Sequence, residues 1–151
     1  MKMFSGMDIS ASALTVQRLR MDVISSNIAN AETTRGRYVD GKWQPYTRKM
    51  VVVEPNNASS FGTVLKNATG NSISGQLGVR ATGIIEDKSP YKKVYQPGHP
   101  DADQEGFIYL PNVDILKETA DLLTATRAYE ANVTALNSTK SMLLKALEIG
   151  R

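Results

Sequence analysis

The feature that most constrains this chain is a repeat of apolar residues near its C-terminal end. Between residues 112 and 149, a large apolar residue recurs every seven positions and three more extend the stripe: Ile115, Leu122, Tyr129, Leu136 and Leu143, with Val133, Leu144 and Leu147. Apolar side chains at this spacing lie on one side of an α-helix. We expect Asn112 to cap the helix and Gly150 to end it. At 1.5 Å per residue, such a helix is about 50 Å long.

The other side of this helix carries small residues where a solvated helix would carry Lys and Glu. They are Ala120, Thr124, Ala128, Ala131, Ala135, Ser138 and Met142. Between Glu118 and Lys140 the only charged residues are Asp121, Arg127 and Glu130. Because small side chains let neighbouring backbones come close, we expect two packing faces, one inside the chain and one for other copies or other proteins. The alternative is that the alanines only raise helix propensity.

A second long helix is predicted near the N-terminus. Ser5 and Asp8 resemble a capping box, and Asn30 is suited to end the helix. Its apolar residues cover roughly 220° of the helix surface, more than the ~100° stripe of an ordinary surface helix. They are Ile9, Ala13, Leu14, Val16, Leu19, Met21, Val23, Ile24 and Ile28. We therefore expect this helix also to have more than one partner. The asparagine-rich segment 27–34 has an alternative interpretation as a polar helix end and nothing else.

The middle of the chain is predicted to be a small, mostly antiparallel β unit. Residues 35–44 are expected to form a polar loop, and strands are expected at 48–53, 77–87, 91–95 and 106–110. Residues 56–75, rich in Asn, Ser, Thr and Gly, are predicted to be a flexible loop. The fold class is thus α+β. We predict a discontinuous helical domain (5–31 plus 112–149) that is packed like a helical hairpin or coiled coil and mediates assembly. Residues 32–111 are predicted to form a small β-rich domain.

Composition limits the range of functions. The net charge of +3 comes from scattered Lys and Arg, so nucleic-acid binding is weakly supported. The absence of cysteine excludes disulfides, thiolate zinc sites and a cysteine nucleophile. The N-terminus does not read as a cleavable secretory signal, and no stretch approaches the ~20 apolar residues of a membrane span.

Few residues suggest chemistry. Asp101, Asp103 and Glu105 before Gly106 copy the first half of a calcium loop, but Asn112 stands where that loop needs Glu, which favours a solvated acidic turn. The single histidine, His99, has no second histidine or cysteine for a catalytic dyad or a zinc site. We expect no enzyme, no metal and no cofactor. A second hypothesis is a module that binds cell-wall peptidoglycan or an acidic partner through region 77–110, with Arg80, Lys88, Lys92 and Lys93.

Both ends of the chain resemble the rod, hook and filament axial proteins of the bacterial flagellum, and most closely the proximal rod proteins. The N-terminal similarity runs from Met7 to Ala31, and shorter pieces follow at 46–52, 78–84, 97–103 and 111–114. The strongest piece is 125–133 together with 140–143. These motifs cover most of the chain and occur in the expected order.

The resemblance implies a structural subunit of the flagellar rod in the periplasm, exported through the flagellar type III apparatus without a cleaved signal. Its terminal helices would polymerise, being wholly or partly disordered in the monomer and ordered in the assembly, with the β unit further out. The implied partners are copies of the chain and the neighbouring rod proteins FlgB, FlgF, FlgG and FliE. The MS ring and the surrounding bushing are further candidates, peptidoglycan is a weaker one, and no nucleic acid or membrane span is implied.

The residues expected at the assembly interface come from both helices. They are Ile9, Leu14, Val16, Leu19, Met21, Val23, Ile24, Asn27, Ile28 and Asn30 from the first, and Leu122, Ala128, Tyr129, Ala131, Asn132, Val133, Ala135, Leu136, Met142, Leu143 and Leu147 from the second.

Overall fold

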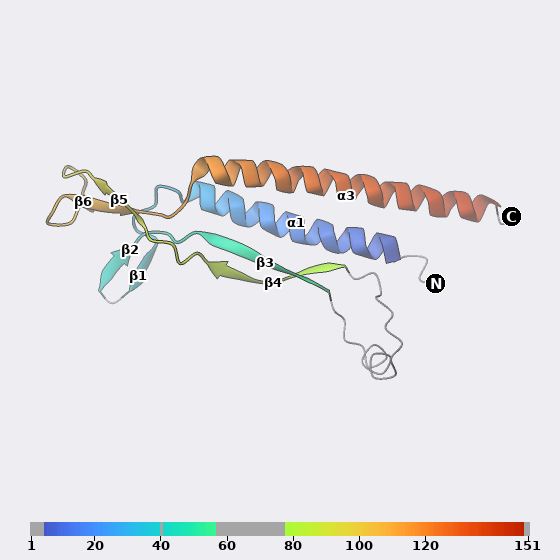
Figure 1. Ribbon diagram of the computed structural model, residues 1–151, viewed down its shortest axis with the longest axis horizontal. Coiled ribbons are helices and arrows are strands. Elements are labelled where there is room, and N and C mark those ends of the chain that lie inside the picture. Colours follow the sequence, from blue (N-terminus) through green and yellow to red (C-terminus); the bar gives the residue numbers. More distant parts are fainter. Residues whose placement is uncertain (1–4, 40, 57–77, 150–151) are drawn as a thin grey trace, which may run out of the picture. The chain divides into compact units, whose positions relative to one another are not determined.

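The computed structural model describes residues 5–39, 41–56 and 78–149, with two long helices and six short strands (Figure 1). In chain order the elements are α1 (Ser5–Ala29), β1 (Arg37–Val39), β2 (Lys42–Gln44), β3 (Lys49–Pro55), β4 (Val79–Glu86), β5 (Lys92–Tyr95), β6 (Phe107–Leu110) and α3 (Ile115–Ile149). The predicted α+β class, with long helices at both ends and small strand pairs between them, is confirmed. Of the predicted flexible loop at 56–75, all but Asn56 lies outside the described residues.

Local hydrogen bonds explain where the two helices meet the rest of the chain. At the end of α1, the backbone N–H of Asn30 donates to the Ser26 carbonyl at 3.1 Å, and the Asn30 side-chain amide donates to the same oxygen at 2.9 Å. At the start of α3, the N–H of Leu116 donates to Asp114 Oδ1 at 3.1 Å. The cap is therefore Asp114, and the prediction that Asn112 caps this helix is wrong because its side chain binds other segments.

The strands form three two-stranded sheets, β1–β2, β3–β4 and β5–β6. The β1–β2 hairpin lies where the sequence led us to expect a loop, so that prediction is wrong. Gly41 has φ +79°, a left-handed conformation suited to a tight hairpin turn, and the paired Tyr38 and Trp43 rings meet edge to face at 5.1 Å. In the β5–β6 pair, Val94 lies opposite Ile108.

Contacts divide the chain into two compact units, and each helix contributes to both. Of the described residues, unit 1 contains 5–18, 52–56, 78–83 and 126–149, and unit 2 contains 19–39, 41–51 and 84–125. The division predicted from the sequence differs from these units, because it separates the chain by secondary structure into a helical domain and a β-rich domain. That division stays a proposal.

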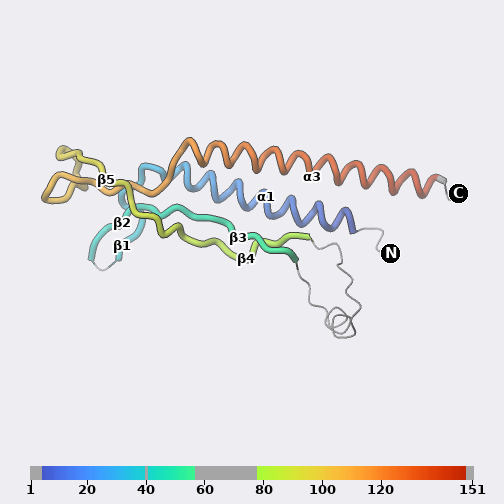
Figure 2. The backbone as a smooth tube through the Cα atoms, viewed as in Figure 1, coloured from blue at the N-terminus to red at the C-terminus, as the bar shows by residue number. Residues whose placement is uncertain are grey.

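In unit 1, the first half of α1 lies beside the second half of α3 (Figure 2). A Cβ added to Gly6 would lie 3.8 Å from Thr139 Cγ2. The start of β4 also contacts α1, because the N–H of Val79 donates to Ser12 Oγ at 3.2 Å. The buried side chains of α1 in this unit are Ser10 and Val16.

In unit 2, the second half of α1 packs beside the first half of α3 and against the start of β3. Its buried apolar side chains are Val23, Ile24, Ile108, Val113 and Ala125. Two polar side chains, Asn27 and Glu118, are buried with them. As far as the described residues extend, neither helix is long and apolar enough to cross a membrane.

Candidate assembly surface and the clasp behind it

The buried carboxylate of Glu118 is at the centre of unit 2. Only 1% of its side chain is exposed, and Arg48 Nε donates to its Oε1 at 2.6 Å. The guanidinium also lies 3.4 Å from Asp87 Oδ2 and 3.8 Å from Asp121 Oδ2. A buried charge is costly unless it is paired and hydrogen-bonded, so this ion pair is required once Glu118 is buried.

The charges of this group are set by their neighbours. Burial opposes the charge on Arg48, but the hydrogen bond and the charge of Glu118, with those of Asp87, outweigh it and raise the pKa of Arg48. Hydrogen bonds from the Ser89 hydroxyl and the Ser89 backbone N–H lower the pKa of Asp87, and Arg48 lowers it further. The cation and this carboxylate are therefore both charged at neutral pH.

Asn27 joins α1 to the start of β3 and to α3. Its Oδ1 accepts from the N–H of Lys49 at 2.9 Å and from the Tyr46 hydroxyl at 3.0 Å. Its Nδ2 donates to the Lys49 carbonyl at 2.8 Å and to Glu118 Oε2 at 3.0 Å. One side-chain amide thus binds both backbone groups of Lys49, as a neighbouring strand would.

Asn112 joins the backbone just before β3 to the backbone that follows β4. Its Oδ1 accepts from the N–H of Arg48 at 2.8 Å, and its Nδ2 donates to the carbonyls of Asp87 at 3.1 Å and Ser89 at 3.2 Å. We name Arg48, Glu118, Asp87, Asn27 and Asn112 the clasp. Within unit 2, the clasp fixes the end of α1, the starts of β3 and α3, and the end of β4.

Large apolar side chains remain exposed on α3 in both units. In unit 2, Leu116 is 83% exposed and Leu123, seven residues later, is 61% exposed. In unit 1, Met142, Leu144 and Leu147 are all more than half exposed. Apolar side chains grouped on one element are typical of surfaces that bind another protein.

The structure sorts the predicted assembly residues into three groups. Val16, Val23, Ile24 and Asn27 are buried within their own chain; Ala131, Ala135, Met142 and Leu147 are exposed; and the rest are half-buried, namely Ile9, Leu14, Leu19, Met21, Ile28, Asn30, Leu122, Ala128, Tyr129, Asn132, Val133, Leu136 and Leu143. The four buried side chains are used inside the chain, whereas the exposed and half-buried ones keep surface in contact with solvent.

Sequence reasoning missed the role of Glu118 and the exposure of Leu116 and Leu123. Glu118 lies three residues after Ile115 and four before Leu122, within the predicted apolar stripe. A carboxylate in that position indicates a buried cation, which could have been sought. Leu116 and Leu123 form a second seven-residue repeat, one position beyond the predicted stripe.

The acidic turn considered for calcium is bound to its own chain. Arg35 Nε donates to Asp101 Oδ1 at 2.7 Å and Thr34 Oγ1 donates to Asp101 Oδ2 at 2.8 Å. Both hydrogen bonds lower the pKa of Asp101, and the one from Arg35 has the larger effect. Across residues 5–39, 41–56 and 78–149, no group of three or more His, Cys, Asp or Glu side chains is placed to hold a metal ion.

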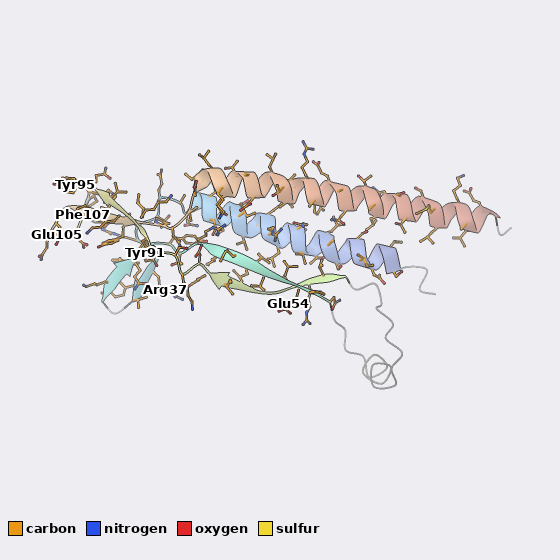
Figure 3. All side chains as sticks on the ribbon, viewed as in Figure 1. Arg37, Glu54, Tyr91, Tyr95, Glu105 and Phe107 are labelled. Atoms are coloured by element: carbon orange, nitrogen blue, oxygen red, sulfur yellow. The ribbon has the colours of Figure 1, made fainter. Side chains whose placement is uncertain are left out.

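Three of the four cations considered for cell-wall binding have partners within the chain. Arg80 lies 3.9 Å from Glu54, and Lys92 Nζ donates to the Val113 carbonyl at 2.7 Å. Lys93 Nζ lies 4.0 Å from the centre of the Phe107 ring and 3.8 Å from Glu105. Phe107 in turn packs against Tyr95 at the β5–β6 hairpin (Figure 3).

Comparison with known proteins first defines the class. Residues 7–36 match the family described as flagella basal body rod protein. Residues 104–149 match the family described as flagellar basal body rod FlgEFG protein C-terminal. The matches cover most of α1 and all of α3, which places the long helices among those of flagellar rod proteins.

Full-length relatives are more specific. The chain is 52% identical to the flagellar basal-body rod protein FlgC of Bacillus subtilis over the whole of both chains. It is 45% identical to the FlgC of Borreliella burgdorferi over 99% of this chain and 98% of that one, and 43% identical to the FlgC of Escherichia coli O6:H1 over 95% of each. The chain belongs to the FlgC family of flagellar basal-body rod proteins. The resemblance noted in its sequence is thereby confirmed.

Proposed function

We propose that the chain is a structural subunit of the flagellar basal-body rod, which joins copies of itself and other rod proteins through its two terminal helices and transmits torque. Membership of the FlgC family over the full length supports the role as a structural subunit of the rod. The observation that carries the proposed contacts through the terminal helices is the exposed apolar surface of α3, with Leu116 at 83% and Leu147 at 64% exposed. Such a surface is costly in water and stable when covered by a neighbour.

The neighbours we propose are FlgB, FlgF, FlgG and FliE in the periplasmic rod. The C-terminal match to a FlgEFG family supports similar last helices in several rod proteins, and similar helices can pack by similar contacts. A repeated head-to-tail contact between such subunits builds an open helical assembly. Export through the flagellar type III apparatus and the absence of catalysis belong to the same proposal, because a subunit of the shaft needs positions and contacts rather than reacting groups.

The test is incorporation into rods in cells that lack the native protein. Leu116→Lys with Leu123→Lys places two charges on the exposed face of α3, where the fold of the free subunit does not depend on them. We expect the variant to be absent from purified basal bodies and the cells to be non-motile. Gln104→Lys, at an exposed polar position of the β5–β6 turn, is the matched control and should be incorporated normally. Normal incorporation of the double variant would contradict the proposed interface.

A further inference from the structure

We propose that the outward face of the β5–β6 hairpin binds glycan strands of the cell wall. This face is formed by the side chains of Lys93, Tyr95, Phe107 and Tyr109, and we name it the aromatic face. The ligand class is a polymer of N-acetylated hexosamine rings, such as the glycan of peptidoglycan. This binding activity goes beyond the proposed rod function and uses none of the helix surface described above.

The pairing of the two strands defines the aromatic face. Lys93 lies opposite Tyr109, and Tyr95 lies opposite Phe107. Because side chains alternate across a strand, these four share one side of the hairpin. The other side is used inside unit 2, where Ile108 is buried. Tyr95 is 65% exposed and Tyr109 is 42% exposed, so the aromatic face is open to solvent.

The Tyr95 ring is exposed and yet held in place. It meets the Phe107 ring edge to face, with the ring centres 5.2 Å apart (Figure 3). A Cβ added to Gly106 would lie 3.0 Å from Tyr95 Cε2, so the ring also lies against the backbone of Gly106. The hairpin is closed by the N–H of Gln96, which donates to the Gly106 carbonyl at 2.9 Å. A ring with so little freedom left to lose is prepared for a ligand.

The charges on the aromatic face nearly cancel. Lys93 Nζ lies 4.0 Å from the centre of the Phe107 ring and 6.0 Å from that of Tyr109. Glu105 Oε2, on an exposed side chain, lies 3.8 Å from the same nitrogen. The rim of the face therefore offers hydrogen-bond donors and acceptors with little net charge. Nucleic acid is a poor match for it, because phosphates are bound by several cations that have no carboxylate beside them.

A sugar ring matches this surface in both shape and polarity. A hexosamine ring has a flat side of C–H groups, and hydroxyl and acetamido groups around its rim. The C–H groups can pack on the electron-rich face of a tyrosine ring, while the rim groups bond to Lys93, Glu105 and the tyrosine hydroxyls. A protein anchor is normally buried in a desolvated pocket. Here each exposed ring ends in a hydroxyl and adjoins a charge, which favours the sugar.

The position of the hairpin leaves the aromatic face accessible when α3 is covered by a neighbour. Within unit 2, the β5–β6 hairpin extends beyond the start of α3 rather than along it (Figures 1 and 2). A shaft that transmits torque must also turn, so any contact with the wall has to break rapidly. A shallow face without an enclosing pocket provides such a weak contact, with a Kd on the order of 1 mM.

Nuclear magnetic resonance on the full-length free subunit, titrated with chitohexaose, tests the binding directly. We expect the largest shift changes at the ring signals of Tyr95, Phe107 and Tyr109, and small changes elsewhere. Co-sedimentation with purified peptidoglycan sacculi is the second arm, because it separates glycan from stem peptide. Sacculi stripped of their peptides by an amidase should still bind the subunit. An absence of ring shifts, or binding that is lost together with the peptides, would overturn the inference.

Tyrosine variants locate the site. Tyr95→Ala with Tyr109→Ala should weaken binding to sacculi by at least about fivefold, because two stacking surfaces are removed. Tyr38→Ala is the matched control, since it removes a tyrosine of similar exposure, 61%, from the β1–β2 hairpin and should bind as the native chain does. Equal binding by the double variant and the native chain would contradict the assignment. A native chain that binds sacculi but never enters rods would contradict the proposed function alone.

Discussion

Glu118 shows how a single residue can determine the local structure. A carboxylate with 1% of its side chain exposed must be compensated, and Arg48 and Asn27 compensate it from two different segments. Since the backbone of Arg48 is bound by Asn112 and that of Lys49 by Asn27, the cation is brought to the carboxylate by the segment that leads into β3. The result is a polar centre in which each group holds the next in position.

Arg48→Met should lower the free energy of unfolding of the free subunit by about 3–5 kcal/mol, because it leaves a buried carboxylate unpaired. Urea denaturation followed by circular dichroism measures this. Arg127→Met is the control, for which a change below about 1 kcal/mol is expected because its ion pair is exposed. Similar losses in the two variants would show that burial of Glu118 is not what makes Arg48 important.

Asp87 gives a pH dependence whose sign follows from its pKa. Since the pKa of the folded state is lowered, this carboxylate contributes stability that is fully present above its unfolded pKa of about 3.9 and is lost as the pH falls through the lower folded value. The difference in stability between the native chain and Asp87→Asn should therefore be constant from pH 7 to about 5 and shrink in stronger acid. Denaturation curves at several pH values measure it. A difference that grows toward low pH would be inconsistent with the lowered pKa.

At the scale of elements, the β5–β6 connection depends on one glycine conformation. Gly106 has φ +79°, and a Cβ there would lie 3.0 Å from Tyr95 Cε2 and 3.2 Å from Pro97 Cβ. Gly106→Ala should thus cost about 1–2 kcal/mol for the left-handed backbone, with a further cost for the contact. Gly98→Ala, in the same connection with nothing within 4 Å of the added atom, should be close to neutral. Thermal unfolding compares the two variants. Equal midpoint temperatures would contradict the claim that the β5–β6 connection depends on the left-handed conformation of Gly106.

The elements also show what the sequence could and could not reveal. Both helices were predicted within a few residues because a seven-residue apolar repeat is a local signal. The β1–β2 hairpin was missed although Asp40-Gly41 is a favourable turn dipeptide between Tyr38-Val39 and Lys42-Trp43, because polar neighbours hid the alternation. The clasp could not be predicted in detail, since it joins Arg48 to Glu118 across 70 residues and no local pattern reports such a pairing.

At the scale of the whole molecule, the apolar side chains of the two helices fall into a buried set and an exposed set. Side chains such as Val23 and Ile24 are used up inside unit 2, whereas Leu116, Leu123, Met142 and Leu147 are left exposed. In a FlgC-family chain, exposure of this kind matches the need of a rod subunit to bind many neighbours. Burial within the chain explains why an apolar residue on these helices is not automatically an interface residue.

Disulfide cross-linking in assembled basal bodies tests whether these helices build the rod, and it is specific because the chain has no cysteine of its own. Single cysteines would be placed at the exposed positions Leu123, Ala131 and Met142, and the control would be Gln104→Cys. Neighbouring rod proteins would carry cysteines on their own terminal helices. We expect cross-links from the three helix positions to other subunits, with few from Gln104→Cys. Intact rods in which the helix positions form no intersubunit cross-links would contradict the claim that these helices build the rod.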